Sequence, residues 1–201
     1  MSNRLADSCL IVVIDMHKGH IGPEATIPAP DAEVQQLVPR MESFLEGARD
    51  LSIPIVHVRY EAVNGIHNAH PAWDARWADK HCVVGSSTTE LVVKPQHDDF
   101  LIESKRTYNC FAHTDLELYL KRLGRDTVVI LGIATDCCCL ATAFGAADLH
   151  YKVISILDCQ VGMTIETSNA ALAIVQAMLG QVMTSGEFLE RAADTAGAQA
   201  A

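Results

Sequence analysis

Short runs of apolar residues alternate with amphipathic stretches along this chain. The apolar runs are continuous and rich in β-branched residues, and they cover 9–15, 53–60, 126–134 and 152–158. Such runs are typical of strands that are buried on both faces of a parallel sheet. The stretches between them repeat apolar residues at helical spacing, over 31–51, 114–124, 139–150 and 168–180. The alternation predicts an α/β fold, a three-layer α/β/α sandwich with a mostly parallel sheet.

Helix start and stop signals agree with these boundaries. Thr114 is followed three residues later by Glu117, which is the pattern of a capping box. Gly124 and Gly180 each follow a helical stretch and act as stop signals. Pro39 interrupts the first helical stretch and predicts either a later start or a bend there.

The region from about 61 to 100 is the least regular part of the chain, and it contains both tryptophans, Trp73 and Trp77. Long irregular segments within compact domains often form binding loops. No repeat or linker divides the chain. We therefore predict a single domain over 1–190, with a substrate-covering loop at about 61–100 and a flexible tail at 191–201.

Composition narrows the choice of partners. The chain has 201 residues, 49% of them hydrophobic, and a formal net charge of −10. An acidic surface repels phosphate backbones and anionic lipids, so neither nucleic acid nor a membrane is expected as a partner. Every apolar run is shorter than the roughly 20 residues that span a bilayer, and the N-terminus reaches an acidic residue too soon for a signal peptide. We expect a cytoplasmic protein.

Three of the seven cysteines are adjacent: Cys137, Cys138 and Cys139. Adjacent cysteines bridge only with strain, and no second Cys or His pair completes a zinc pattern, so neither a disulfide framework nor a zinc site is predicted. Cys138 follows a predicted strand and begins an alanine-rich helix, where the helix N-terminus stabilises a thiolate and its N–H groups can bind an oxyanion. It is a candidate nucleophile, whereas its two neighbours are expected to point away and pack.

Two charged residues also follow predicted strands. Asp15 ends the first apolar run, and Lys105 follows the short run "DFLIES". Functional groups gather at the carboxyl ends of the strands in an open parallel sheet. Taken alone, each is more often a turn residue or a solvated lysine than a catalytic group.

Three ordered motifs carry a family resemblance: "LIVVIDMHKGH", "ESKRTYNCFAHTDLE" and "VVILGIATDCCCLATAFGAADLHYKVISILD". With them the chain resembles the isochorismatase-like superfamily of cysteine hydrolases, whose members include nicotinamidases, N-carbamoylsarcosine amidases, maleamate amidases, and ureidoacrylate and biuret amidohydrolases. The resemblance implies the Rossmann-like fold of that superfamily and a catalytic triad of Asp15, Lys105 and Cys138. It also implies a cis peptide bond between Ile133 and Ala134, with the N–H groups of Ala134 and Cys138 as the oxyanion hole.

The resemblance implies a cysteine-dependent hydrolase that cleaves a C–N bond in a small amide, ureide or carbamoyl substrate through a thioester. Asp15 would accept the thiol proton and pass it to the leaving amine, while Lys105 holds the carboxylate. A cysteine nucleophile favours this branch over vinyl-ether hydrolysis. It further implies no cofactor and a homo-oligomer, a dimer or tetramer.

Three alternatives stay open. One is a metal-assisted amidase of the nicotinamidase type, and another is a catalytically silent binding protein with the same fold. The third is a flavodoxin-like nucleotide binder, which the sequence disfavours because no glycine-rich phosphate loop follows the first strand.

The chain departs from the nicotinamidase pattern after the second strand. Those enzymes bind a metal there through an Asp-x-His pair and further downstream histidines, but Tyr60 and Ala62 hold the two positions here. No metal is therefore predicted. A weaker alternative set of ligands consists of His67 and His70 with His57 or Glu61.

Other residues near the predicted site are candidates for contacting the substrate. For each of them, turn formation or core packing is the competing explanation. They are His17, His20, Arg59, Trp73, Trp77, Phe111 and Thr135.

Overall fold

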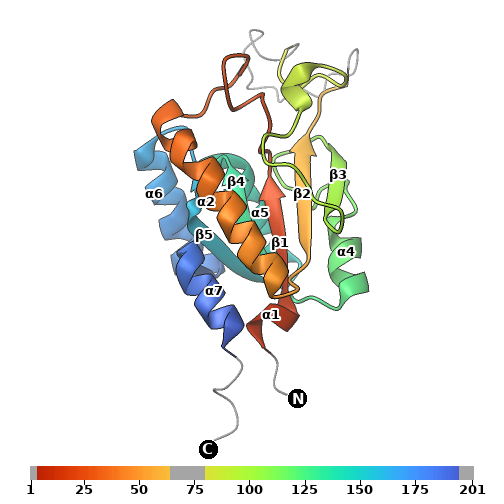
Figure 1. Ribbon diagram of the computed structural model, residues 1–201, viewed down its shortest axis with the longest axis vertical. Coiled ribbons are helices and arrows are strands. Elements are labelled where there is room, and N and C mark those ends of the chain that lie inside the picture. The colour runs from red at the N-terminus through yellow and green to blue at the C-terminus, as the bar shows by residue number, and fades with distance from the viewer. Residues whose placement is uncertain (1–3, 64–79, 195–201) are drawn as a thin grey trace, which may run out of the picture.

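The computed structural model describes residues 4–63 and 80–194, which form a sheet between two layers of helices (Figure 1). The strands are β1 (Cys9–Ile14), β2 (Ile55–Tyr60), β3 (Phe100–Lys105), β4 (Thr127–Ile133), β5 (Lys152–Val161) and β6 (Gln181–Met183). Their order is β3-β2-β1-β4-β5-β6, and every neighbouring pair is parallel. The predicted fold class is confirmed, with β6 as a strand that the sequence pattern did not reveal.

Helices cover both faces of the sheet. Figure 1 shows α2 (Asp31–Asp50) and α7 (Ser185–Ala193) in front of it, with α5 (Leu140–Asp148) behind. The remaining helices are α1 (Leu5–Ser8), α4 (Leu116–Leu123) and α6 (Ile165–Ile174). The described residues also contain the shorter turns η1 (Ser87–Thr89), η2 (Thr135–Cys139) leading into α5, and η3 (Val175–Leu179) extending α6.

Two hydrophobic cores lie on the two faces of the sheet because successive strand residues point to opposite sides. On β1, the odd-numbered residues Cys9, Ile11 and Val13 pack with side chains of α2 and α7. The even-numbered residues Leu10, Val12 and Ile14 pack with side chains of α4 and α5. All six residues of β1 are buried, as a continuous apolar run predicts for a central parallel strand.

Helix α2 begins at Asp31 and continues through Pro39, so of the two predicted outcomes the later start is wrong, and the bend stays a prediction. A proline inside a helix removes one backbone hydrogen bond and costs about 3 kcal/mol. Leu37 before the proline and Met41 after it are both buried in the core beneath the helix. Their burial offsets this cost.

The start of α4 also differs from the prediction. The helix begins at Leu116, whose N–H donates to the Thr114 hydroxyl at 3.2 Å, and the capping box with Glu117 does not form. The Thr114 hydroxyl itself donates to the carbonyl of Cys110 at 2.5 Å. Gly124 ends the helix with a left-handed φ of 63°, as predicted.

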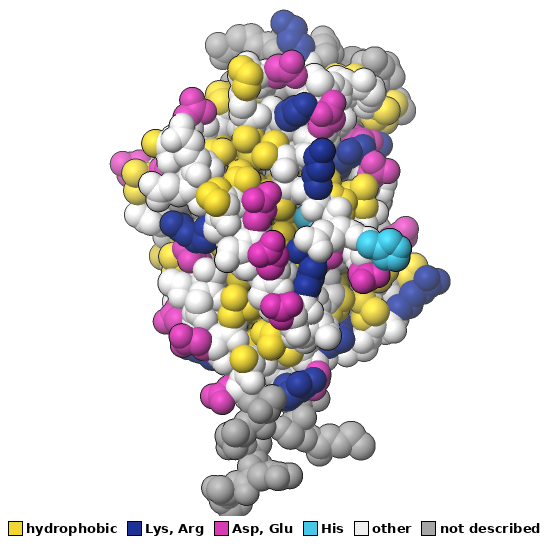
Figure 2. Space-filling model, viewed as in Figure 1, with side chains coloured by type: hydrophobic (Ala, Val, Ile, Leu, Met, Phe, Trp, Pro, Cys, Tyr) yellow, Lys and Arg dark blue, Asp and Glu magenta, His cyan; other side chains and the backbone are white. Residues whose placement is uncertain are grey.

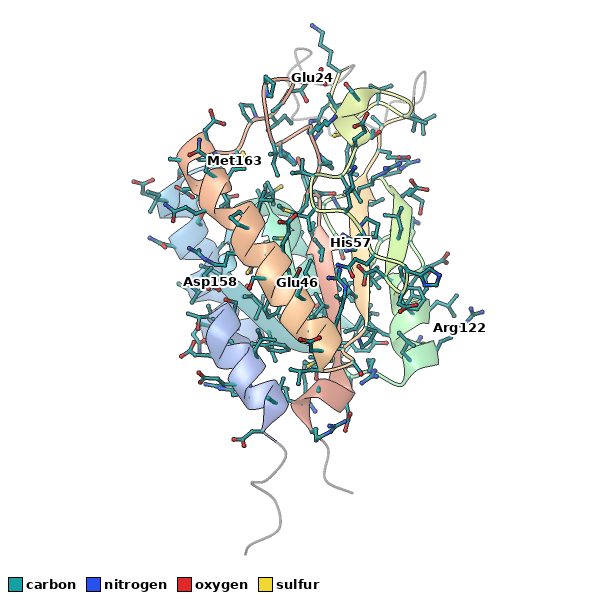
Figure 3. All side chains as sticks on the ribbon, in the orientation of Figure 1. Glu24, Glu46, His57, Arg122, Asp158 and Met163 are labelled. Carbon is teal, nitrogen blue, oxygen red and sulfur yellow. The ribbon has the colours of Figure 1, made fainter. Side chains whose placement is uncertain are left out.

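The C-terminal helix α7 was not predicted, although its N-terminus carries a capping box of Thr184 and Glu187. Asp158, labelled in Figure 3, ties β5 to this helix by accepting hydrogen bonds from the Ser185 N–H at 2.7 Å and hydroxyl at 2.8 Å. The helix runs to Ala193, three residues into the segment predicted as a tail. Residues 195–201 lie outside the described residues, as do Trp73, Trp77, His67 and His70.

Charged side chains of both signs are scattered among hydrophobic ones on the face drawn in Figure 2. On this face the acidic residues therefore form no single patch. Among the described residues, no helix combines the length and apolar composition that crossing a membrane requires.

Candidate active site

Asp15 directly follows β1, at the carboxyl edge of the sheet. Its φ of 51° is left-handed, a conformation that Asp adopts more readily than most residues. Its N–H donates to the Val58 carbonyl at 2.8 Å, and its Oδ1 accepts from the Tyr60 N–H at 2.6 Å. On the other side of β1, a Cβ on Gly132 would overlap the Ile14 carbonyl oxygen, so only glycine lets β4 approach here. The neighbouring strands thus fix the carboxylate.

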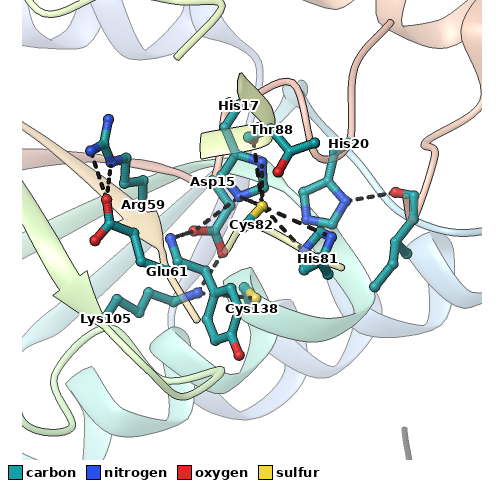
Figure 4. Close-up of polar contacts among 12 residues, drawn as sticks. Asp15, His17, His20, Arg59, Glu61, His81, Cys82, Thr88, Lys105 and Cys138 are labelled. Atoms are coloured by element: carbon teal, nitrogen blue, oxygen red, sulfur yellow. Dashed lines mark hydrogen bonds and ion pairs between the residues drawn. The ribbon is translucent and has the colours of Figure 1, made fainter. Parts of the chain in front are cut away.

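Lys105 is the last residue of β3 and is fully buried. Its Nζ donates to Asp15 Oδ2 at 2.5 Å and to Cys138 Sγ at 3.4 Å (Figure 4). The ammonium also lies 5.6 Å from the centre of the Tyr60 ring. The fold therefore brings together three groups that are 90 and 33 positions apart in the chain.

Cys138 lies in η2, the π turn that leads from β4 into α5. The Ile133–Ala134 peptide bond before this turn is cis, as the resemblance implies. The Ala134 carbonyl accepts hydrogen bonds from the N–H groups of Cys137 at 3.1 Å and Cys139 at 3.0 Å. These two hydrogen bonds form the turn that holds Cys138 at the start of α5.

The Asp15–Lys105 pair is ionised. Burial would raise the pKa of Asp15, but Lys105 and His17 outweigh it and hold that pKa below its ordinary value. Burial would likewise lower the pKa of Lys105, yet the carboxylate of Asp15 holds that pKa well above 10.5. Two opposite charges in contact, out of water, each favour the charged form of the other.

The neighbouring thiols of Cys137 and Cys138 shift each other's pKa in opposite directions. A hydrogen bond from the neighbouring thiol lowers the pKa of Cys137, while that bond and burial raise the pKa of Cys138, against the opposing effect of Lys105. At rest Cys138 is therefore a thiol, and a base must take its proton before the sulfur can attack.

Cys137 lines the same cavity as Cys138, so the expectation that it points away is wrong. The cavity lies at the N-terminal end of the turn that leads into α5, and both Cys137 and Cys138 of that turn border it. Cys139 is buried and packs beneath α5, as expected.

A cavity of about 210 Å³ opens above the sulfur. It is smaller than the roughly 300 Å³ at which pockets for drug-sized ligands begin. Met163, at the carboxyl end of the sheet in Figure 3, forms part of its wall. The lining residues are Asp15, His20, Ile27, Tyr60, His81, Tyr108, Ala134, Cys137, Cys138 and Met163.

The predicted substrate contacts divide into two groups. His20 lines the cavity, and His17 is buried directly behind it, with the two rings stacked at 4.8 Å between centroids. Thr135 is buried but is not among the residues that line the cavity, and its hydroxyl has no hydrogen-bond partner among the described residues.

Arg59 and Phe111 do not belong to the cavity wall in the described part of the chain. The Arg59 guanidinium pairs with Glu61 at 2.6 Å and Glu103 at 2.5 Å. Its neighbour Tyr60 faces the cavity, and successive strand residues point to opposite sides. Phe111 stacks on Tyr151 with ring centroids 6.0 Å apart. Trp73 and Trp77 lie outside the described residues.

His81 is a site residue that the sequence reasoning missed. Together with His17 and His20 it forms a buried cluster in which one ring nitrogen of each residue lies within 4.8 Å of the other two. Burial lowers the pKa of all three, that of His81 to about 3, so the rings are neutral at pH 7. The spacing of the first two histidines was visible in the sequence, but nothing local connects them with the third.

The metal positions of the nicotinamidase pattern do not fit this chain. Ala62 has no ligand atom, and the Tyr60 ring stacks against His81 with centroids 5.8 Å apart. The histidine cluster draws two of its three members from the loop after β1 instead.

A parallel sheet whose carboxyl edge brings a carboxylate and a thiol to one small cavity, with an ammonium in contact with both, is typical of a hydrolase with an α/β fold. The chain belongs to the isochorismatase family: residues 9–187 match the isochorismatase domain. The described ranges contain every member of the predicted triad.

Known relatives cover almost the whole chain. It is 29% identical to YwoC, an uncharacterised isochorismatase family protein of Bacillus subtilis (strain 168), over 90% of this chain and 92% of that protein. It is 26% identical to the maleamate amidohydrolase of Pseudomonas putida, over 93% and 88% of the two chains. The solved structure of an isochorismatase-like hydrolase from Alkaliphilus metalliredigens superposes with a TM-score of 0.76 and 30% identity, covering 91% and 98%. The family match identifies the protein as a member of a hydrolase family.

Proposed function

We propose that the protein is a cysteine-dependent amidohydrolase that cleaves a C–N bond in a small amide, ureide or carbamoyl compound through a thioester. The observation that carries the proposal is the position of Lys105 Nζ, 2.5 Å from Asp15 Oδ2 and 3.4 Å from Cys138 Sγ. A carboxylate base and a cation beside a thiol at a cavity are the groups that acyl transfer requires.

In the first half-reaction, Asp15 accepts the proton of Cys138, and Lys105 stabilises the thiolate. The sulfur attacks the carbonyl carbon, and the negative charge moves to the carbonyl oxygen. The N–H groups of Ala134 and Cys138, at the start of the helix, are the proposed donors to that oxygen. The C–N bond then breaks, and the departing nitrogen takes the proton from Asp15.

In the second half-reaction, Asp15 accepts a proton from a water molecule, whose oxygen attacks the thioester carbon. The C–S bond breaks, the acid is released, and the thiolate regains the proton. Each half-reaction returns Asp15 to its ionised, Lys105-bound state, so the triad is ready for another turnover.

The cavity supports a small substrate. Its volume of about 210 Å³ leaves little room beyond one amide group and a short body. Its wall carries neither Arg nor Lys within residues 4–63 and 80–194. Because a buried carboxylate is costly without a cation or several donors, this wall favours uncharged amides over carboxylate-bearing ones.

The test is ammonia release from a panel of nicotinamide, biuret, maleamate, ureidoacrylate, N-carbamoyl amino acids and simple aliphatic amides. On any substrate that is turned over, Cys138→Ser should lower kcat by at least about 10⁴-fold. Cys137→Ser is the matched control, since it removes a sulfur from the adjacent position of the same cavity, and it should change kcat/KM by less than about tenfold.

Mass analysis of the quenched enzyme should locate the acyl group on Cys138. Equal losses in the two serine variants, or an acyl group on Cys137, would reject Cys138 as the nucleophile. A kcat in Cys138→Ser that equals that of the parent would reject the thioester altogether.

A further inference from the structure

The buried histidine cluster of His17, His20 and His81 plays no part in the proposed triad chemistry. His17 and His81 are also close to the thiol of Cys82, which lies 3.5 Å from the ring nitrogens of His17 and 3.6 Å from His81 Nε2. Figure 4 shows the three rings grouped beside Asp15, around that thiol. A core rarely contains three adjacent imidazoles, because each ring carries two polar nitrogens whose burial costs free energy unless they bind a partner.

The surrounding loop orients two of the rings. His20 Nδ1 lies 2.8 Å from the Ile27 carbonyl oxygen, which can only accept, so Nδ1 carries the proton and Nε2 carries a lone pair. His81 Nδ1 lies 2.7 Å from the Thr26 hydroxyl. The loop itself is held by hydrogen bonds from the Thr26 and Ile27 N–H groups to the Gly19 carbonyl, each 3.1 Å. Outer hydrogen bonds of this kind orient histidines that ligate metals.

We propose that His17, His20 and His81 bind one divalent transition-metal ion of the zinc class, in a site that opens into the cavity beside Cys138. Neutral imidazoles select Zn²⁺, Co²⁺ or Ni²⁺ over Mg²⁺ and Ca²⁺, which prefer oxygen. The carboxylate of Asp15, whose Oδ1 lies 3.9 Å from His17 Nε2, adds negative charge nearby. Lys105 neutralises part of that charge.

The geometry requires only a small adjustment. With metal–nitrogen bonds of about 2.0–2.1 Å, ligands of a tetrahedral ion lie about 3.4 Å apart. One ring nitrogen of each histidine already lies within 4.8 Å of the other two, so movements of about 1 Å shared among the rings complete the site.

Three protein ligands leave one position of a tetrahedral ion open, which is the pattern of reactive rather than structural zinc sites. His20 and His81 both line the cavity, so the open position faces the space where a substrate binds. Metal binding as such does not depend on the proposed amidase activity.

The competing explanation is that the cluster only fills space. Both explanations expect substitutions to lower stability, so the distinguishing measurement is metal affinity. The full-length Cys138→Ser protein, stripped with a chelator, should bind one equivalent of Zn²⁺ by calorimetry, and Co²⁺ should produce the intense visible bands of a four-coordinate site. The serine prevents the metal from being captured by the nucleophile.

In that background, His20→Gln and His81→Gln should each weaken Zn²⁺ binding by about 100-fold or more, because each removes a ligand. Thr26→Val should weaken it by about tenfold through loss of the outer hydrogen bond to His81. His97→Gln is the matched control, since that side chain is 99% exposed and distant in the sequence, and it should bind as tightly as the parent.

Thermal unfolding gives a second readout. Zn²⁺ at about 100 times its Kd should raise the melting temperature of the parent by roughly 5–10 °C. The rise should disappear in His20→Gln and His81→Gln, whose folding is checked by circular dichroism. If one of these two variants fails to fold, the Zn²⁺ affinities of the other variant and of Thr26→Val test the proposal. The proposal would be overturned if His20→Gln and His81→Gln bound Zn²⁺ as tightly as His97→Gln does. It would also be overturned if the parent bound less than one equivalent.

Discussion

Two ion pairs, one fully buried and one half-buried, lie near opposite ends of the sheet and serve different tasks. Lys105 and Asp15 meet at the carboxyl edge, with 0% and 1% of their side chains exposed. Arg49, in the last turn of α2, pairs with Asp99, just before β3 begins, at 2.6 Å and with 22% and 4% exposed. His57, labelled on β2 in Figure 3, lies 3.3 Å from the same Asp99 oxygen.

The difference lies in what each cation can still reach. Arg49 donates two hydrogen bonds to Asp99, which also accepts from the Gln96 N–H at 2.8 Å, so that carboxylate is surrounded by structural partners. Lys105 instead divides its donors between a carboxylate and a thiol beside a cavity. A point-charge ammonium with three donors can serve two acceptors in this way, whereas the planar guanidinium suits a bidentate clamp. The Arg49–Asp99 pair therefore stabilises the fold at one end of the sheet, whereas the Lys105–Asp15 pair forms part of the reactive site at the other end.

The largest expected effect comes from removing the cation of the reactive pair. Lys105→Met should lower kcat/KM by about 10³-fold or more and the free energy of unfolding by about 3–5 kcal/mol, because Asp15 is left as an unpaired buried charge. Ammonia release and urea unfolding measure the two quantities.

The double variant Asp15→Asn, Lys105→Met is the control. Removing both charges should recover most of the lost stability, to within about 1–2 kcal/mol of the parent, and recover no activity. A double variant as unstable as Lys105→Met would show that the charge imbalance is not the cause.

Breaking the Arg49–Asp99 pair should lower stability without lowering activity. Asp99→Asn removes the charge that Arg49 and the Gln96 N–H bind, and should lower the free energy of unfolding by about 1–3 kcal/mol. Because Asp99 is remote from the cavity, kcat/KM should stay within about twofold of the parent. A loss of activity comparable to that of Lys105→Met would break the distinction between the two pairs.

The same residue predicts how stability depends on pH. Burial alone would raise the pKa of Asp99, but its contacts with His57 and Arg49 outweigh burial and hold the pKa well below 3.8. A carboxyl group with a lowered folded pKa contributes stability that is complete above its ordinary pKa and is lost as the pH falls towards the folded one. The difference in unfolding free energy between the parent and Asp99→Asn should therefore be constant from about pH 7 to 5 and shrink below about pH 4. A difference that grows on acidification would contradict this assignment.

The smallest effect is expected for an exposed pair. Lys121 and Glu117 lie one helical turn apart on α4, 2.7 Å from each other, with 63% and 36% of their side chains exposed. Water screens such a pair and its side-chain entropy opposes it, so Glu117→Gln should leave the melting temperature unchanged within about 1 °C. A larger shift would mean that burial is not what separates the first two pairs from this one.

Much of the fold could be predicted because its signals are local. The four apolar runs that were interpreted as strands correspond to β1, β2, β4 and β5, and the resemblance placed Asp15, Lys105 and Cys138 in order along the chain. Strand β6 has only three residues, which is too short for a periodic pattern to appear. The start of α4 was misassigned because Thr114 binds the backbone of Leu116 and Cys110 instead of closing a capping box.

The sequence by itself determined that strands and helices alternate, that the strands are buried on both sides, and that a thiol begins a helix. These follow from hydrophobic spacing and from propensities that act within one turn or one strand. Only the tertiary structure decided that Lys105 bridges Asp15 and Cys138, that Cys137 shares the cavity, and that His81 joins His17 and His20. Each of these contacts joins segments through a parallel crossover or a long loop, and their distances depend on how whole elements pack rather than on any neighbouring residue.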